Sequence, residues 1–257
     1  MSEFDLLITG GTVVAADAST KCDIAVKDGR IAALGSNLGQ AADMIDASGR
    51  LVLPGGVDSH CHIEQLAASG LINSDTFETA TRAAAAGGTT TVIPFAAQYE
   101  GMSLTKVVED YHTLARKGAM VDYAFHMIIA GPNPEVLEQE LPPLVEAGHA
   151  SIKMFMTYDR LRVDDDQMLD VLTKARELGA FVMVHAENHH MITLMVKRLL
   201  DRGATAPKFH AVSHPRAGEA EAFTRLIAMS ELIDQPVMIF HVSSAEGVDV
   251  IRAARAR

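Results

Sequence analysis

The chain has 257 residues, 48% of them hydrophobic, and a formal net charge of −11 at pH 7. That charge argues against a nucleic-acid-binding surface and gives no reason to expect binding to an anionic membrane. No apolar run is long enough to cross a bilayer, no signal-peptide pattern opens the chain, and two cysteines cannot form a disulfide framework, so we expect a protein of the reducing cytoplasm.

Residues 1–54 are predicted to be rich in β-strands. The apolar runs are short and are interrupted by Gly-Gly, Asp-Gly and Ser-Gly, as in DLLITGGTVVAAD, CDIAVKDGRIAALG and MIDASGRLVLPGG. Asp-Gly between two alternating runs is a strong signal for a β-hairpin. We therefore expect residues 1–54 to form a small β-domain that is separate from residues 55–257.

After Pro54, short apolar strands alternate with helical segments, and the first of these strands is read from Leu51. The strands are rich in β-branched residues, as strands buried on both faces are, and they are LVLPGGVDSHCH, GTTTVIPF, VDYAFHMIIAG, HASIKMFMTY, AFVMVHAEN and PVMIFHVSS. The first helix is expected at 75–87, with Asp75 and Glu78 as a capping box. Further helices are expected at 104–114, 164–179, 217–234 and 245–257.

Six successive strand-then-helix units imply a parallel sheet with right-handed crossovers. A doubly wound sheet and a (β/α)8 barrel both fit this order. The barrel is favoured because polar residues collect at the C-terminal ends of several strands, where barrels build their sites. The sequence also lacks the Gly-x-Gly-x-x-Gly turn of a dinucleotide-binding fold. We therefore expect an α/β fold, with about six of the eight barrel strands in residues 55–257.

Four histidines lie near the C-terminal ends of predicted strands. His60 and His62 end the first strand, His185 ends the fifth, and His241 lies in the sixth. Because side chains alternate along a strand, His60 and His62 share one face and Cys61 points to the other. A single histidine on an apolar strand is more often a core residue than a ligand. Four of them at three strand ends favour a shared metal site.

Lys153 lies inside the apolar segment ASIKMFM, where an unpaired charge is costly. Burial lowers the pKa of a lysine toward that of a neutral amine at physiological pH. A neutral amine can combine with carbon dioxide, with loss of a proton, to form a carbamate. The carbamate is an anion with two oxygens that can bridge two metal ions. The alternative is a lysine that reaches solvent or pairs with an acid, and the sequence leaves both open.

The other histidines of the barrel region are expected to be structural or solvated. A lone histidine in such a place is by itself a weak sign of a ligand. They are His126 and His149 in the core, His189 and His190 in a solvated loop, and His210 and His214 in a proline-containing connection.

Taken in order, these segments resemble the cyclic amidohydrolases, specifically the hydantoinase and dihydropyrimidinase group of the amidohydrolase superfamily. The matching segments span essentially the whole chain and are LPGGVDSHCHIE, GGTTTVIPF, SIKMFMTYD, VMVHAEN, APKFHAVSHP and FHVSS. The resemblance implies a metal-dependent-hydrolase barrel of the TIM type, a small N-terminal β-sandwich domain within residues 1–54, and a homotetramer.

The resemblance also implies a site with two Zn²⁺ ions. His60 and His62 would bind the more buried ion, His185 and His241 would hold the second, and carboxylated Lys153 would bridge both. Zinc is only a preference, since imidazole and carboxylate ligands also accept Mn²⁺ or Co²⁺.

By the same resemblance, a metal-bridging hydroxide opens the ring of a cyclic amide or ureide and gives an N-carbamoyl amino acid. Tyr158 matches the tyrosine that hydrogen-bonds the substrate carbonyl as it becomes an oxyanion, and its alternative role is that of a core aromatic. Phe155 and the loop 64–74, which includes Leu66, match positions that line the pocket for the substrate's ring substituent.

The sequence departs from the family pattern toward its end. The family has a metal-binding aspartate at the end of strand eight, and strands seven and eight are missing here. We therefore expect these residues to be an N-terminal fragment that is inactive alone. Cys61 stands where relatives often have threonine or another small residue, and it should matter little because it faces away from the ions.

Two kinds of alternative function stay open. An allantoinase, a dihydroorotase or a cyclic imide hydrolase would share the ions and differ in the pocket. A dihydroorotase is disfavoured because Glu64 and Gln65 stand where an arginine for its substrate is expected. A non-catalytic scaffold protein would keep the barrel and lose the ligands, whereas all four histidines and the lysine are present.

Overall fold

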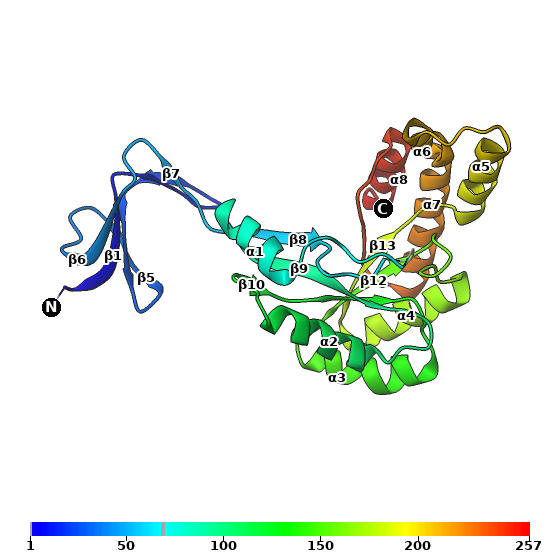
Figure 1. The fold of residues 1–257 in the computed structure, drawn as a ribbon, viewed down its shortest axis with the longest axis horizontal. Helices are drawn as coiled ribbons and strands as arrows, with labels where there is room; N and C mark the ends of the chain where they lie inside the picture. Colours follow the sequence, from blue (N-terminus) through cyan, green and yellow to red (C-terminus); the bar gives the residue numbers. More distant parts are fainter. Residues whose placement is uncertain (1, 68–69) are drawn as a thin grey trace. The chain divides into compact units, whose positions relative to one another are not determined.

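The structure is a computed structural model that describes residues 2–67 and 70–257. The chain divides into two compact units, Met1–Gly56 and Val57–Arg257, which can be followed by their colours in Figure 1. In the described residues, no helix combines the length and the apolar character that a membrane span requires.

The first unit contains two β-sheets. Its strands are β1 (Phe4–Thr9), β2 (Thr12–Val14), β3 (Ser19–Lys21), β4 (Asp23–Lys27), β5 (Arg30–Gly35), β6 (Ala41–Asp46) and β7 (Leu51–Val52). They are ordered β5-β4-β1-β6 in one sheet and β3-β2-β7 in the other. The predicted Asp-Gly hairpin is confirmed. Asp28 and Gly29 join β4 to β5 with φ angles of 51° and 71°, as a tight hairpin turn requires.

The second unit is built on one mainly parallel sheet. Its strands are β8 (Gly56–Cys61), β9 (Thr89–Gln98), β10 (Asp122–Tyr123), β11 (His126–Ile129), β12 (Ser151–Phe155), β13 (Phe181–His185) and β14 (Val237–Ile239). β10 and β11 lie along the same side of β9, one after the other, so they share one strand position. β8 pairs with β9, and β11, β12, β13 and β14 follow in parallel on the other side. The predicted series of six strands is therefore present in the described chain.

The predicted first strand is wrong in one respect, because LVLPGGVDSHCH forms two strands and not one. β7 pairs with β2 of the first unit, and β8 pairs with β9 of the second. Pro54 lies between them and has no backbone N–H to donate to a sheet, so the ladder is interrupted there.

Helices follow most of the strands. They are α1 (Phe77–Ala86), α2 (Leu104–Arg116), α3 (Leu141–Glu146, preceded by the π-helical turn Val136–Glu140), α4 (Asp165–Leu178), α5 (His189–Asp201), α6 (His210–Ser213, after the 3-10 turn Pro207–Phe209), α7 (Arg216–Ile233) and α8 (Ala245–Arg255).

Two local predictions about these helices are wrong. The capping box of α1 is formed by Thr76 and Thr79, one residue beyond the predicted pair, since each side chain pairs with the other's backbone N–H. His189 and His190 are not in a loop but begin α5. The side chain of Asn188 accepts a hydrogen bond from the Met191 N–H and so starts the helix directly after β13.

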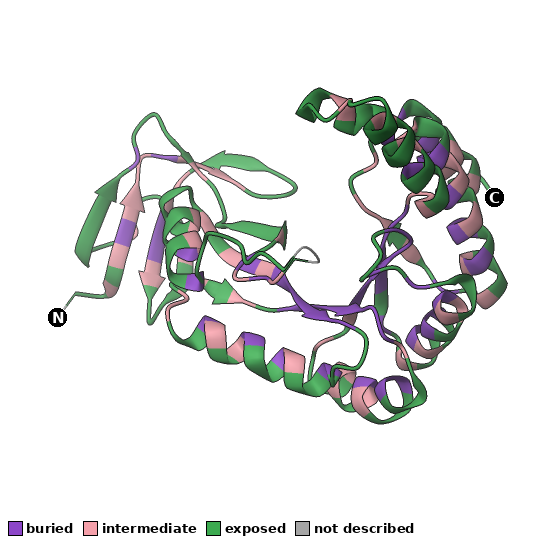
Figure 2. Cartoon of the chain, turned by 45° about the vertical axis from the view of Figure 1, so that its right-hand side comes forward, coloured by how far each residue is buried: buried purple, intermediate pink, exposed green. Residues whose placement is uncertain are grey.

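The two faces of the sheet have different neighbours. Alternate strand residues such as Ile152, Met154 and Val184 pack with helix residues in the larger core cluster. The residues between them, including Phe95, Ile128 and Phe155, form a second cluster that contains no helix residue. Helices thus cover one face only, and Figure 2 shows them along the convex side of the curved sheet. This excludes the doubly wound alternative and fits part of a (β/α)8 barrel.

Candidate active site

Lys153 is the central residue of the site. It lies in β12 beside Ile128 of β11 and Met183 of β13, on the face of the sheet that carries no helices. Its side chain is 2% exposed. Among the described residues, its Nζ is the one buried side-chain nitrogen or oxygen atom with no hydrogen-bond partner. An unpartnered buried amine is costly, so the position calls for a function beyond packing.

The surroundings of the amine are aromatic. Its Nζ lies 4.1 Å from the centroid of the Phe240 ring, 5.0 Å from that of Phe155 and 5.9 Å from that of Phe95. Burial lowers the pKa of Lys153 from 10.5 to about 7. A large fraction of the amine is therefore neutral near neutral pH, which is the form that can react with carbon dioxide.

The first pair of imidazoles comes from the end of β8. Cys61 packs against the helix-side core, so His60 and His62 face the other way, as predicted. The His60 and His62 ring centroids are 5.7 Å apart, and the His62 ring stacks on Phe95 at 4.9 Å. Partial burial lowers the pKa of His60 to about 4, and the charges of Lys153 and nearby histidines add to this effect. An imidazole kept neutral is the form that binds a cation.

The second pair comes from β13 and from the turn after β14. His185 and His241 have ring centroids 4.6 Å apart, and His185 stacks on Phe155 at 5.5 Å. His241 has a φ of 38°, a left-handed conformation that is rare in a residue with a Cβ. His241 also lies 5.7 Å from His60, centroid to centroid, and so links the two pairs. The structure thus brings together all five predicted ligands.

The imidazoles are arranged as pairs and not as trios. Across residues 2–67 and 70–257, no three His, Cys, Asp or Glu side chains are placed to hold one metal ion. One imidazole of each pair stacks on a phenylalanine that also contacts the lysine amine: His62 on Phe95 and His185 on Phe155. A carbamate on Nζ would give each pair a further oxygen donor. The residues present therefore fit a two-ion site bridged by a modified lysine.

Two residues beside the imidazoles were not predicted. Glu187 Oε2 lies 2.7 Å from His185 Nε2, and Gln65 Oε1 lies 2.5 Å from His62 Nδ1. The pKa of Glu187 is lowered despite its partial burial, because it accepts this bond and lies near other imidazoles. The only signal in the sequence was a polar residue two or three positions beyond a candidate ligand.

Of the predicted substrate-binding residues, Tyr158 has the clearest place. It follows β12 in a turn, has a φ of 71° and is 40% exposed. Its ring centroid is 5.0 Å from that of His185. Partial burial and the charge of Glu187 raise the pKa of its hydroxyl, so the phenol keeps its proton and can donate it in a hydrogen bond.

Phe155 and Leu66 are placed differently. Phe155 is 7% exposed and its ring stacks on that of His185, so it packs against the second pair of imidazoles. The Leu66 carbonyl accepts a hydrogen bond of 2.7 Å from the Tyr99 hydroxyl, which anchors this part of the predicted pocket loop. Residues 68 and 69 of that loop lie outside the described residues. The roles of Phe155 and Leu66 stay predictions.

A cavity of about 640 Å³ adjoins the second pair of imidazoles. Its lining includes Tyr158, His185, Glu187, His210, His214 and His241. His210 and His214 were expected to be structural, and their rings do contact each other, at 4.3 Å between centroids. Both also line this cavity, so they lie on the same side of the site as His185 and His241.

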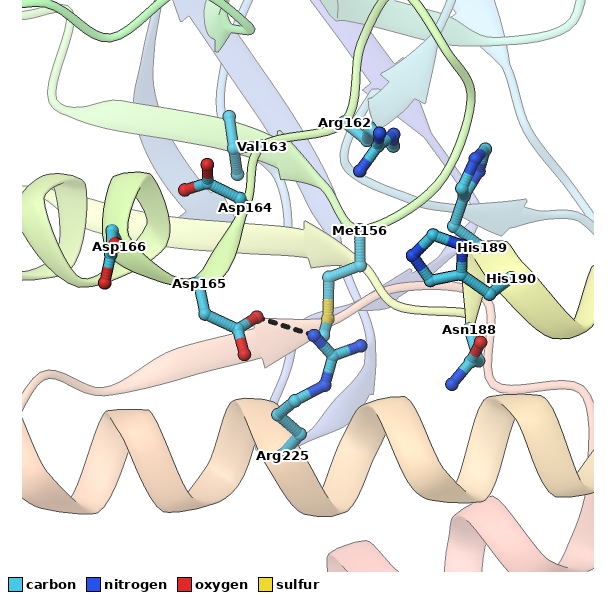
Figure 3. A pocket seen from close by; sticks show the side chains of 10 residues that line it. All are labelled: Met156, Arg162, Val163, Asp164, Asp165, Asp166, Asn188, His189, His190 and Arg225. Atoms are coloured by element: carbon cyan, nitrogen blue, oxygen red, sulfur yellow. Dashed lines mark hydrogen bonds and ion pairs between the residues drawn. The ribbon is translucent and has the colours of Figure 1, made fainter.

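The pocket in Figure 3 is separate from this cluster. It has a volume of about 370 Å³ and lies at the start of α4 and α5, and none of the predicted site residues lines it. Two of its three acidic side chains have local partners: Asp164 caps α4, and Asp165 pairs with Arg225 at 2.5 Å. We therefore place the candidate active site at the imidazoles and not in this pocket.

Comparisons with known proteins show the family and the fold of the chain. Residues 51–214 match the sequence profile of the amidohydrolase family. The chain is 41% identical over 254 residues to a D-hydantoinase of Rhizobium radiobacter, which is 98% of this chain and 55% of that protein. A solved D-hydantoinase structure superposes with a TM-score of 0.95 at 40% identity, covering 99% of this chain and 55% of the other. The crystal structure of dihydropyrimidinase from Brevibacillus agri NCHU1002 superposes with a TM-score of 0.92 at 40% identity, covering 97% of this chain and 54% of the other. The chain thus spans about half the length of these relatives.

Proposed function

Because the chain belongs to the amidohydrolase family, we propose that it supplies the metal-binding half of a hydrolase that opens cyclic amides. The substrates we propose are hydantoins and dihydropyrimidines, which give N-carbamoyl amino acids. The observation that carries the proposal is the convergence of four imidazoles on Lys153, whose buried amine has no partner among the described residues. The similarity to D-hydantoinases and a dihydropyrimidinase supports the substrate class.

In this proposal His60 and His62 would hold one divalent cation, His185 and His241 would hold another, and a carbamate on Lys153 would supply oxygen donors to both. Zn²⁺ is the proposed metal, with Mn²⁺ or Co²⁺ as alternatives. Such a pair supplies Lewis acidity and an acidified water near neutral pH. The rings of Phe95, Phe155 and Phe240 surround the Lys153 amine and keep water from it.

We assign Tyr158 to substrate binding at the mouth of the cavity. Its phenol stays protonated at neutral pH and lies beside His185. From there it can donate a hydrogen bond to the carbonyl oxygen of a cyclic amide and stabilise the negative charge that develops on it. The left-handed turn holds the ring in place, because two backbone N–H groups, of Leu161 and Arg162, donate to the Tyr158 carbonyl.

The assembly and the location of the protein are also proposals. We propose a homotetramer in the cytoplasm, on the basis of the family resemblance and of a chain with two free cysteines. Light scattering of the purified protein would test the tetramer.

The proposed function is tested with the full-length protein encoded by the gene. We expect about two zinc ions per chain by elemental analysis, and ring opening of hydantoin or dihydrouracil detected as a loss of ultraviolet absorbance. Allantoin and a cyclic imide belong in the same panel, because they distinguish the related activities. A protein without stoichiometric metal and without turnover on any of these substrates would be a scaffold, and the proposal would be wrong.

A further inference from the structure

Two of the four site imidazoles each have one ring nitrogen held by an outer residue. His62 presents Nδ1 to Gln65 Oε1 at 2.5 Å, and His185 presents Nε2 to Glu187 Oε2 at 2.7 Å. An amide oxygen and a carboxylate oxygen are acceptors only, so the ring nitrogen that faces each of them must carry the proton. A neutral imidazole has one N–H, and its other nitrogen then keeps a free lone pair.

We infer that Gln65 and Glu187 are positioning residues that fix His62 and His185 in opposite tautomers. His62 is protonated on Nδ1 and leaves Nε2 free, whereas His185 is protonated on Nε2 and leaves Nδ1 free. Outer residues of this kind orient metal-binding imidazoles and raise their basicity in many metalloproteins. The use of the free nitrogens for metal binding rests on the proposed function, but the tautomers themselves do not.

The surroundings of Gln65 show that it is built into the site. Its side chain is 8% exposed, unlike most glutamines. Its backbone N–H donates to the Asn73 side chain at 3.1 Å, and its carbonyl accepts from the Asn73 N–H at 3.2 Å. These two hydrogen bonds fix the backbone of Gln65 and so position its side chain against His62. The position therefore couples the loop that begins at residue 64 to the first pair of imidazoles.

Glu187 is held in a comparable way at the second pair. It lies two residues beyond His185, at the end of β13, and lines the cavity beside His185 and His241. The next residue, Asn188, caps α5 with its side-chain oxygen and donates its amide hydrogen to Glu221. Asn188 therefore fixes the backbone beside Glu187, and the carboxylate is directed at His185.

The tautomers can be measured in the metal-free chain. In two-dimensional ¹H–¹⁵N spectra at about pH 8, where unperturbed imidazoles are neutral, protonated and unprotonated ring nitrogens have well-separated ¹⁵N shifts. Loss of a signal in His62→Asn or His185→Asn assigns it. We expect one protonated Nδ1 at His62 and one protonated Nε2 at His185. The reverse tautomer, or an averaged mixture, at either residue in the wild-type chain would overturn the inference.

Variants then separate positioning from packing. Gln65→Leu and Glu187→Leu should each convert only the adjacent histidine to a mixture of tautomers and weaken Zn²⁺ binding by about 10- to 100-fold. Gln65→Glu and Glu187→Gln keep an acceptor oxygen and should retain the wild-type tautomers. Gln235→Leu is a matched control, because the Gln235 side chain is buried and bonds no histidine. It should leave both tautomers unchanged.

The outcomes distinguish this inference from the proposed function. If both leucine variants keep single wild-type tautomers, the inference is wrong, whatever the metal content. If the tautomers change as expected but the wild-type chain binds no Zn²⁺, the inference holds and the proposed function fails.

Discussion

Two buried polar side chains on neighbouring strands have opposite surroundings. His126, the first residue of β11, donates from Nε2 to the Ser59 carbonyl at 3.0 Å and accepts at Nδ1 from the Ser151 hydroxyl at 2.6 Å. Lys153, within β12, has a buried amine with no hydrogen-bond partner among the described residues. The two side chains are 7% and 2% exposed.

The difference separates a structural residue from a functional one. His126 was expected to be a core residue, and both of its ring nitrogens are in fact occupied. Hydrogen-bonded buried groups stabilise a fold, whereas an unpaired buried amine destabilises it. The unpaired amine of Lys153 therefore destabilises the fold, and it lies where the four imidazoles come together. A buried group without a partner in the metal-free fold is a candidate for binding a ligand or for covalent modification.

The largest effect is expected from Lys153→Met, which removes the amine and keeps much of its volume. We expect the full-length protein to lose its bound zinc and its activity, with Zn²⁺ affinity reduced by more than the roughly 100-fold cost of losing an outer partner. The metal-free protein should become more stable by about 1–3 kcal/mol, since the unpaired amine is gone. Elemental analysis and urea unfolding measure the two effects, and retained stoichiometric zinc would contradict the bridging role.

The difference in the free energy of unfolding between Lys153→Met and the wild type should depend on pH. The pKa of Lys153 falls from 10.5 to about 7 on folding, so between these values the unfolded chain binds more protons than the folded chain. The free energy of unfolding of the wild type should therefore rise with pH between 7 and 10.5, by roughly 1 kcal/mol per pH unit from this group. The stability advantage of Lys153→Met should be largest below pH 7 and shrink above it. Lys174→Met, which removes ion pairs with the exposed Glu138 and Glu177, should show no such advantage.

Tyr158→Phe tests whether the cavity beside the imidazoles is the place of reaction. The variant should lower kcat by about 100- to 1,000-fold, as the loss of an oxyanion donor does. Zinc content should stay unchanged, because Tyr158 is not among the five proposed ligands. Steady-state kinetics on hydantoin, with metal analysis of the same sample, would check this, and an unchanged kcat would remove Tyr158 from the mechanism.

His126→Leu is the structural counterpart of Lys153→Met. It removes two hydrogen bonds and leaves the Ser59 carbonyl and the Ser151 hydroxyl unpaired, so the free energy of unfolding should fall by about 2 kcal/mol. The folded protein should keep its zinc. A loss of metal without a loss of stability would show that His126 belongs to the site and is not a structural residue.

The smallest effect is expected at Cys61, which packs on the helix side of the sheet. Burial raises the pKa of its thiol to about 11, so it should react slowly with an alkylating reagent at pH 8. Cys61→Ala should cost about 1 kcal/mol of stability and leave zinc content unchanged. Rapid loss of zinc on alkylation would instead place Cys61 at the metal.

The sequence by itself determined the strand order and the shared face of His60 and His62, because strand alternation is a local property that specifies which face a side chain takes. It left open whether Lys153 is buried or reaches solvent, and only the structure shows that the side chain is buried. The family membership and the barrel also followed from the sequence and are confirmed by the comparisons. Even so, the strand predicted across Pro54 was wrong, because its two halves find partners in different units.

Only the tertiary structure decided which polar residues surround the imidazoles. Gln65 and Glu187 are close to their histidines in sequence, yet their contacts depend on the hydrogen bonds between Gln65 and Asn73 and on how α5 starts. His210 and His214 reach the cavity from a connection far along the chain. Distances across loops are fixed by packing and by hydrogen bonds between segments. The periodicity of a strand or helix does not predict them.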